Sequence, residues 1–346
     1  MQRMPHPASG MTPEKLNPPS ARNTDSCLPL HPAGEVVHDY STTGPAPGDI
    51  RFGWAHGSIP AAKNSDPHVQ VVRYNEDTFC MRENICVDWR GPFTFLLFGN
   101  KGALLIDTGA TENSAWYPLR STVEALILQW EGIRRKTDTP LTIALTSAEN
   151  AAQNGGLSQF AGRANTTVVP RALPAMQSFY GVNGKGPEAT GQIDLGGRIL
   201  DAVPTPGTHR DGVSFYDRYT HLLFTGDLLF PGRIAIANER DYMASLERLQ
   251  QWKAAHPVKW VMGGHIDMQF LPGKAYSRFA TFKPYERELQ MEPEQIEEAA
   301  SCAKEIAGKQ TVLARSQFWM RQGVGPDEQP ESLPAGMPDI RGSRPV

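Results

Sequence analysis

Polar residues that could do chemistry follow four short apolar runs of this sequence. Asp107 lies in "LLIDTG", while Asp227 ends "LLFTGD" and His265 ends "WVMGGH", and each lies within two residues of a glycine. Thr208 and His209 follow a fourth run, in "AVPTPGTHRDG". An aspartate and a histidine in one cavity can carry out acid–base catalysis or bind a metal ion. Polar side chains gathered at strand ends are a common way for an α/β scaffold to build such a site.

The elements that must position these residues form a mixed pattern of strands and helices. Apolar runs separated by turn residues predict strands over 68–74, 78–87, 93–99, 102–109, 141–146, 166–170, 196–207, 213–217, 221–227 and 258–265. Apolar residues at helical spacing predict helices over 116–130, 241–255 and 292–308. Two groups of strands, each covered by helices, predict an α/β (α+β) fold with a four-layer αββα sandwich. We expect loops over 171–191 and 231–240, which carry no recognisable motif.

Composition excludes several classes of function for this 346-residue chain. A net charge of −3 and a pI near 6.3 give no electrostatic basis for binding nucleic acid. No apolar run approaches the roughly 18 residues of a membrane span, and the N-terminus lacks the apolar core of a secretory signal. The four cysteines are scattered, so reduced thiols and a cytoplasmic location are expected. We expect a small-molecule ligand, no nucleic acid and no membrane, and leave a homo-oligomer open.

The chain divides into three parts by composition. Residues 1–65 form an irregular, proline-rich N-terminal arm, since residues 1–60 hold 10 of the 29 prolines. Within it, Phe52 and Trp54 should be buried, either on their own domain or on a partner subunit. Residues 66–325 are expected to form the folded domain, and residues 326–346 a C-terminal tail.

Several of these motifs together resemble one enzyme family. "FTFLLFGNKGALLIDTGA", a loop containing Gly155-Gly156, "TPGTHRDGVSFYD", "LLFTGDLLFPGR" and "GGHID" are similar to the metallo-β-lactamase-fold hydrolases over about residues 68–285. The resemblance implies an αββα sandwich of metallo-β-lactamase type. In such enzymes histidine and aspartate hold zinc or iron, which lowers the pKa of a shared water and makes hydroxide near neutral pH.

The positions that carry metal ligands in this family can be assigned from the glycines of the loop. The family's first His, second His, Asp and third His positions fall on Ala148, Asn150, Ala152 and Gln153, and the His after "PG" falls on Thr208. The bridging Asp is kept as Asp227, the last His is kept as His265, and Asp107 matches the residue that orients the ligand loop. A catalytic zinc needs about three protein ligands. We therefore predict a divergent member with no complete zinc or iron site and no metal cofactor.

The leading hypothesis is a metal-independent enzyme in the same pocket. His265 would be the acid or base, Asp227 would orient it, and His209 would be a second proton carrier. The reaction would be hydrolysis, elimination or isomerisation of a small carbonyl-containing molecule, with Ser147 or Thr208 beside His209 as a less favoured nucleophile. The residues expected to bind substrate are Glu149, Asn150, Gln153, Thr208 and Arg233.

Three alternatives stay open. The chain could be a non-catalytic pseudoenzyme that binds a ligand or acts as a scaffold, with Asp107, Asp227 and His265 kept as a satisfied polar network. It could be a metal-dependent hydrolase with a site relocated through His209 or Glu149. It could also be a structural subunit that supports an active relative.

Overall fold

The computed structural model describes residues 37–42, 44–182, 189–309 and 311–322. Within these residues the chain forms two six-stranded sheets and one three-stranded sheet. The first sheet has the order β1 (Val69–Asn75), β2 (Thr78–Glu83), β3 (Phe93–Phe98), β4 (Ala103–Ile106), β5 (Leu141–Ala144) and β6 (Thr166–Val168). The second has the order β13 (Gln290–Met291), β12 (Trp260–Gly263), β10 (Leu222–Gly226), β9 (Val213–Asp217), β8 (Ile199–Pro204) and β7 (Gly191–Asp194).

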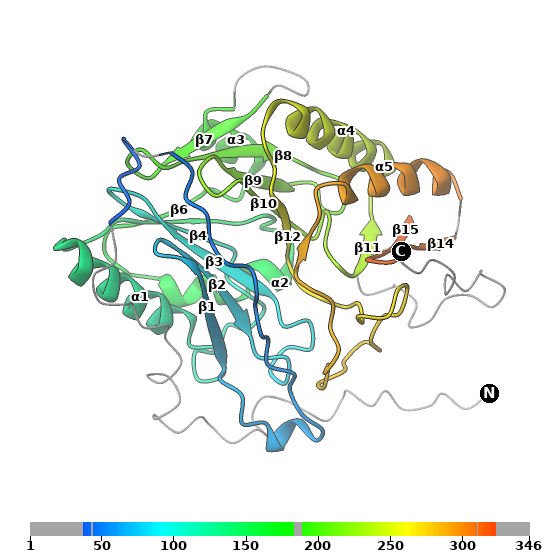
Figure 1. Cartoon of the computed structure of the whole chain (residues 1–346), viewed down its shortest axis with the longest axis horizontal. Helices are drawn as coiled ribbons and strands as arrows, with labels where there is room; N and C mark the ends of the chain where they lie inside the picture. The colour runs from blue at the N-terminus through cyan, green and yellow to red at the C-terminus, as the bar shows by residue number, and fades with distance from the viewer. Residues whose placement is uncertain (1–36, 43, 183–188, 310, 323–346) are drawn as a thin grey trace.

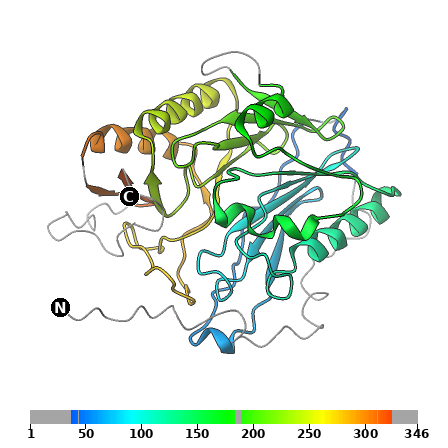
Figure 2. The ribbon, with the colours of Figure 1, turned by 180° about the vertical axis from the view of Figure 1, so that it is seen from behind.

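Helices cover the outer faces of both large sheets. α1 (Leu119–Arg134) covers the first sheet, and α4 (Glu239–Ala255) and α5 (Gln295–Ile306) cover the second. The short α2 (Ala151–Asn154) follows β5, and α3 (Leu173–Tyr180) contributes Met176 and Tyr180 to the apolar cluster between the sheets. Figure 1 shows α1 at the first sheet and α4 with α5 at the second, and Figure 2 shows the same arrangement from behind. The predicted αββα architecture is therefore confirmed: two main sheets lie together and are flanked by helices.

Three apolar clusters account for this layering. Phe95 and Leu97 of the first sheet pack against Phe215 and Phe224 of the second, so one cluster fills the space between the sheets. A second cluster joins the other face of the first sheet to α1, and a third joins the second sheet to α4 and α5. Each sheet thus buries both faces, which matches the nearly continuous apolar runs of its central strands.

The helix α1 forms where the sequence has the right apolar spacing. Leu119, Val123, Leu126, Ile127 and Trp130 recur at intervals of three or four residues, and all are buried against the first sheet. The backbone of Arg135 then takes a left-handed conformation with φ of 52° and ends the helix.

Two segments expected to be loops contain regular structure. Residues 171–191 include the helix α3 and the first residue of β7, and residues 231–240 include the strand β11 (Arg233–Ile236). The strand β11 pairs with β15 (Trp319–Gln322), which pairs in turn with β14 (Val312–Ala314). The local pattern failed here because a four-residue strand is recognisable only through its partner, which lies over 80 residues further along the chain.

The described part of the N-terminal arm packs on its own domain. Phe52 and Trp54 are buried in the cluster between the sheets, and Trp54 contacts Phe93 with ring centroids 4.7 Å apart. The short 3-10 helix η2 (Ala61–Lys63) follows. The domain boundaries at residues 65 and 325 stay predictions, since residues 1–36 and the tail 326–346 lie outside the described residues. No helix in the described part of the chain is long and apolar enough to cross a bilayer.

Candidate functional site

The site is built where β10 and β12 end. These strands run parallel, with Gly226 opposite Gly263, so their carboxyl ends meet at the same edge of the sheet. Asp227 follows β10, and His265 follows β12 after Gly264. A Cβ atom added at Gly264 would lie 2.6 Å from Oδ1 of Asp227, so a glycine is required for the two strand ends to come this close.

The imidazole of His265 lies between two carboxylates. Its Nδ1 is 3.2 Å from Oδ1 of Asp227, and its Nε2 is 3.6 Å from Oδ2 of Asp267. Phe230 covers the ring, with centroids 4.2 Å apart. Burial by itself disfavours the imidazolium, but the charges of Asp227 and Asp267 outweigh it and raise the pKa of His265 to about 9. The ring is therefore a cation at neutral pH.

Asp227 is an anion with partners on both oxygens. Its Oδ2 accepts a hydrogen bond from Nδ2 of Asn150 at 2.6 Å, while Oδ1 faces His265. Burial opposes ionisation, but the charge and hydrogen bond of His265, the charge of His209 and the Asn150 bond lower the pKa of Asp227. Asn150 also caps α2, because its Oδ1 accepts from the backbone N–H of Ala152 at 2.9 Å. The cap fixes the amide that holds Asp227.

Two further aspartates hold the loop between β5 and α2. Asp107 follows β4, with φ of 62°, and its carboxyl accepts from the backbone N–H and the hydroxyl of Thr146 at 2.7 and 2.8 Å. Burial raises the pKa of Asp107 to about 8, against the effect of these bonds. Asp211 accepts from Oγ of Ser147 and from the backbone N–H of Ala148, both at 2.6 Å. The Ser147 hydroxyl thus donates to a carboxylate rather than to His209, and its role as a nucleophile stays a prediction.

A cationic wall faces these residues from a different part of the chain. Arg90 lies in the turn between β2 and β3 and forms a bidentate pair with Asp88, with Nε–Oδ1 and Nη2–Oδ2 both 2.8 Å. Burial opposes its charge, but Asp88, with Asp227 and Glu83, raises the pKa of Arg90. The guanidinium of Arg278 lies 5.9 Å from the ring of Trp89. Arginine and tryptophan in this arrangement can bind an anionic ligand.

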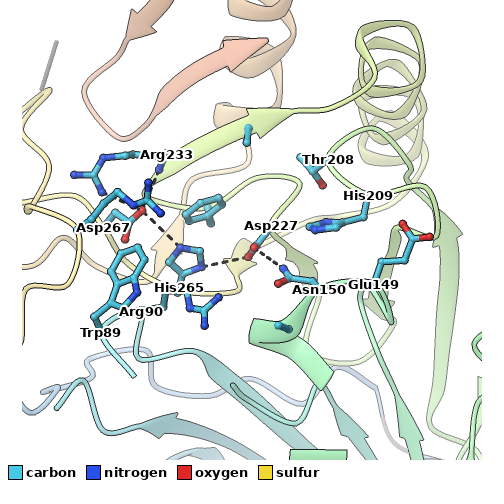
Figure 3. A pocket seen from close by; sticks show the side chains of 14 residues that line it. Trp89, Arg90, Glu149, Asn150, Thr208, His209, Asp227, Arg233, His265 and Asp267 are labelled. Atoms are coloured by element: carbon cyan, nitrogen blue, oxygen red, sulfur yellow. Dashed lines mark hydrogen bonds and ion pairs between the residues drawn. The ribbon is translucent and has the colours of Figure 1, made fainter. Parts of the chain in front are cut away.

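These groups enclose a cavity of about 200 Å³. Figure 3 shows Asp227 near its centre, with His265 and Asn150 on either side and the imidazole of His209 pointing toward it. The residues that line the cavity are Trp89, Arg90, Glu149, Asn150, Ala151, Thr208, His209, Asp227, Phe230, Arg233, Ala235, His265, Asp267 and Arg278.

Seven of the nine residues proposed from the sequence line this cavity, and two do not. Gln153 is buried beneath it, where a Cβ atom added at Gly226 would lie 2.8 Å from its amide nitrogen. Asp107 is buried and holds the loop between β5 and α2 through Thr146. Arg233 was expected in an exposed loop, but it begins β11, is buried, and lies 3.5 Å from Asp267. Glu149 lines the cavity but is partly exposed, and its carboxylate pairs with Arg210.

Sequence reasoning missed several residues of the site. Asp267 and Asp211 lie within the quoted motifs "GGHID" and "TPGTHRDG", two residues after His265 and His209. Their position was therefore a usable signal. Trp89 and Arg90 gave no such signal, because they come from a turn far from the other residues in sequence. In the described part of the chain, no three His, Cys, Asp or Glu side chains are grouped so that they could hold a metal ion.

Comparison with known proteins gives one family match and one curated relative. The profile of the Metallo-beta-lactamase superfamily matches residues 148–265, which begin in the loop held by Asp211 and end at His265. Over 80 residues the chain is 32% identical to "Acyl-coenzyme A thioesterase MBLAC2" of Gallus gallus. This alignment covers 22% of this chain and spans only 29% of the length of that relative.

Solved structures of similar fold include three metallo-β-lactamases. One from Pontibacter korlensis is 19% identical, with a TM-score of 0.41, and the match covers 57% of this chain and 91% of the other. One from Erythrobacter litoralis, with beta mercaptoethanol in its active site, is 15% identical with a TM-score of 0.46, covering 69% and 97%. FIM-1 from Pseudomonas aeruginosa, in a mono-zinc form, is 13% identical with a TM-score of 0.46, covering 69% and 96%.

Proposed function

We propose that this chain, which belongs to the metallo-β-lactamase superfamily, hydrolyses an acyl ester or thioester with an anionic leaving group, with His209 as the general base and no bound metal ion. The observation that carries the proposal is that the polar groups of the cavity differ in what they face. Both nitrogens of His265 and both oxygens of Asp227 face protein partners, whereas the imidazole of His209 faces the cavity.

The donors that remain at the family's metal positions do not fit a zinc or iron ion. A metal ligand must be a neutral imidazole with a free lone pair, but His265 lies between two carboxylates that raise its pKa to about 9. Asp227 accepts an N–H of Asn150, and this amide group would point its positive end toward a cation at that place. Thr208 and Gln153 supply no anionic or imidazole donor. No step of the proposed reaction therefore passes through a metal.

His209 has the position and freedom that a general base requires. It lies between Asp227 and Glu149 and points into the cavity (Figure 3). Within the described residues, its ring makes no hydrogen bond to a side chain or backbone group. A water molecule between His209 and a bound carbonyl would then be activated for attack.

The reaction balances with water as the sole co-reactant. The water oxygen attacks the acyl carbon while its proton passes to an imidazole nitrogen of His209. The tetrahedral intermediate then expels the leaving thiolate or alkoxide, which takes the proton back from His209, and the products are a carboxylic acid and a thiol or alcohol. Arg90 uses Nε and Nη2 for Asp88, so its Nη1 is available within the described residues to stabilise the developing negative charge.

Two observations support a thioester whose leaving group belongs to an anionic carrier. The cationic wall of Arg90 and Arg278 favours an anionic carrier, and the curated relative's name gives thioester hydrolysis as its chemistry. The relative is aligned over a small part of its length, so its activity enters here only as support for the reaction type.

The test is an assay of the full chain on thioesters of an anionic carrier thiol, with the metal content of the protein measured in parallel. We expect turnover that survives dialysis against a chelator. His209→Ala should lower kcat at least 100-fold, whereas His256→Ala, outside the cavity, should leave it unchanged. Activity that disappears with the chelator and returns with zinc would overturn the proposal, as would full activity in the His209 variant.

A binding protein without catalysis is the second candidate, and one observation favours it. His265, Asp227 and Asp267 form a buried network that is satisfied without any ligand, as in a site kept only for its geometry. Saturable binding of the carrier thioester with no turnover, in a protein of verified folding, would select this candidate.

A further inference from the structure

Exposed apolar side chains are concentrated in the segment that connects β12 to β13. We call residues 268–287 the lip. Its large apolar side chains with high exposure are Phe270 at 71%, Leu271 at 59%, Phe279 at 47%, Phe282 at 41% and Tyr285 at 73%. They make up five of the twelve such side chains among the described residues. Scattered exposed apolar residues are ordinary, but a cluster of this size in one segment indicates a binding surface. In Figure 1 the lip, drawn in yellow and gold, extends from β12 and β13 away from the second sheet.

The lip holds a defined conformation, so its apolar side chains stay exposed as a group. Arg82 of β2 forms a bidentate ion pair with Glu286 at 2.6 and 2.7 Å, and both side chains are buried. The backbone of Phe270 donates to the carbonyl of Tyr285 at 2.7 Å. Lys283 donates from its backbone N–H to His56 of the arm at 2.8 Å. These contacts tie the C-terminal part of the lip to β2 and to the arm, and they tie its N-terminal part to its C-terminal part.

The lip is continuous with the wall of the cavity. The ring of Phe279 packs against Trp89 with centroids 5.4 Å apart, and the guanidinium of Arg278 lies 5.5 Å from Phe279. Trp89 and Arg278 both line the cavity. The backbone of Phe279 has φ of 63°, a left-handed conformation that is unusual for a bulky residue and that is found at ligand-binding sites more than elsewhere.

The charge of the lip differs from that of the whole chain. Its Lys283 and Glu286 side chains are buried and lie 3.8 Å apart, so the charged side chains that reach its surface are the basic Lys274, Arg278 and Arg287, in a chain whose net charge is −3. A surface that is both apolar and basic complements a molecule that is both apolar and anionic.

The size of the cavity also indicates that a substrate extends onto the lip. Its volume of about 200 Å³ lies below the roughly 300–1,000 Å³ of pockets that enclose a whole ligand. A substrate larger than a compact acyl group must therefore continue outside the cavity, and the lip is the apolar surface that adjoins its mouth.

We propose that the lip binds the apolar chain of an amphipathic anionic substrate, so that the chain prefers medium or long acyl groups to short ones. The cavity then holds the reacting carbonyl and the anionic group faces Arg90 and Arg278. This inference rests on the proposed function of the cavity, and it extends that function to a class of substrate. The continuity through Phe279 and Trp89 favours a soluble substrate over a membrane surface or a second copy of the chain.

The test compares the full chain with a lip variant, Phe270→Ser/Leu271→Ser/Tyr285→Ser. The matched control is Leu128→Ser/Ile133→Ser/Phe179→Ser, which removes exposed apolar side chains of α1 and α3. With acetyl and dodecanoyl thioesters of one carrier, we expect kcat/KM of the parent to favour dodecanoyl at least tenfold. The ratio of kcat/KM for dodecanoyl to kcat/KM for acetyl should be at least tenfold lower in the lip variant than in the parent. In the control it should be unchanged. An equal ratio in parent and lip variant overturns the inference while the proposed hydrolysis stands.

A binding measurement keeps the inference testable if the protein has no turnover. Calorimetry with dodecyl phosphate below its micelle concentration and with ethyl phosphate should give at least tenfold tighter binding of the dodecyl compound, lost in the lip variant. That outcome supports binding of the apolar chain by the lip even if the protein hydrolyses no thioester. The inference is overturned if dodecyl phosphate binds no more tightly than ethyl phosphate and the lip instead binds another partner. That partner would be a membrane if the parent, but not the lip variant, sediments with vesicles of phosphatidylcholine and phosphatidylglycerol. It would be a second copy of the chain if the parent, but not the lip variant, is a dimer in light scattering.

Discussion

Nδ1 of His265 lies 3.2 Å from Oδ1 of Asp227, across the ends of the parallel strands β10 and β12. Asp267 approaches the other nitrogen of the ring, so the histidine is held as a cation between two anions. The positive charge that faces Asp227 is therefore supplied by a side chain of the protein itself. His209 lies on the opposite side of Asp227 and points into the cavity, where we propose that it acts as the general base.

The His265 pair predicts a specific dependence of stability on pH. The pKa of His265 rises from 6.5 to about 9 on folding, so its stabilisation is fully present below about pH 6.5 and is lost as the pH rises through 9. The contribution at neutral pH is on the order of 3 kcal/mol at most. The difference in free energy of unfolding between the parent and His265→Gln, measured with urea, should therefore shrink from pH 6.5 to pH 10. The control His256→Gln should show no such trend, and a gap that stays constant with pH would contradict the charged pair.

Zinc should fail to stabilise the protein. The imidazolium of His265 has no free lone pair at neutral pH, and Asp227 is already bonded to Asn150. A thermal unfolding scan with excess zinc should give a Tm within about 1 °C of the scan with chelator, since a ligand stabilises only when it binds the folded state. Elemental analysis after dialysis should find zinc and iron far below one ion per chain. A zinc-dependent rise of Tm by several degrees would mean that donors outside this network hold the metal.

The carboxylate of Asp211 should matter more than the hydroxyl it binds. Asp211→Ala removes the carboxylate that accepts the backbone N–H of Ala148 and of Glu149, at 2.6 and 3.2 Å, and the hydroxyl of Ser147 at 2.6 Å. The loss should be about 1–3 kcal/mol in the free energy of unfolding, because the Asp211 side chain is buried and its donors lose their acceptor. Ser147→Ala removes the bond to Asp211 and a long bond from the N–H of Glu149 at 3.2 Å, which Asp211 still accepts, and it should cost about 1 kcal/mol. Asp49→Ala, at an exposed aspartate, serves as the control, and equal effects of Asp211→Ala and the control would refute this account of the loop.

The buried pair of Arg82 and Glu286 should be a main support of the lip. Glu286→Gln leaves the Arg82 guanidinium buried without its counter-ion, and such a change costs about 3–5 kcal/mol. Glu124→Gln breaks the exposed pair with Arg120 on α1, and it should cost less than about 1 kcal/mol. Chemical denaturation measures both. Proteolysis of the folded Glu286 variant should cut within the lip before it cuts the rest of the domain, and resistance equal to that of the parent would contradict this role.

The sequence by itself predicted most strands of the two large sheets, the main helices and the strand ends that form the site, but not β7, β13 or the three-stranded sheet. The apolar runs before Asp107, Asp227 and His265 are long enough to read without tertiary information, and the spacing from Leu119 to Trp130 gives α1 directly. The order of these elements along the chain was sufficient for the αββα architecture. Parallel neighbours then require that Asp227 and His265 meet at one edge.

Only the tertiary structure decided which charges face one another. Arg90 comes from a turn of the first sheet, Arg278 from the lip, and neither lies near Asp227 in sequence. Asp267 was visible in the sequence, but its place beside His265 depends on the backbone path after β12. The protonation of a histidine depends on distances of a few ångströms to such groups and on burial, and no local pattern encodes either. The sequence could therefore name candidate residues of the site, while the fold determined that His265 is held as a cation between two carboxylates and that His209 points into the cavity.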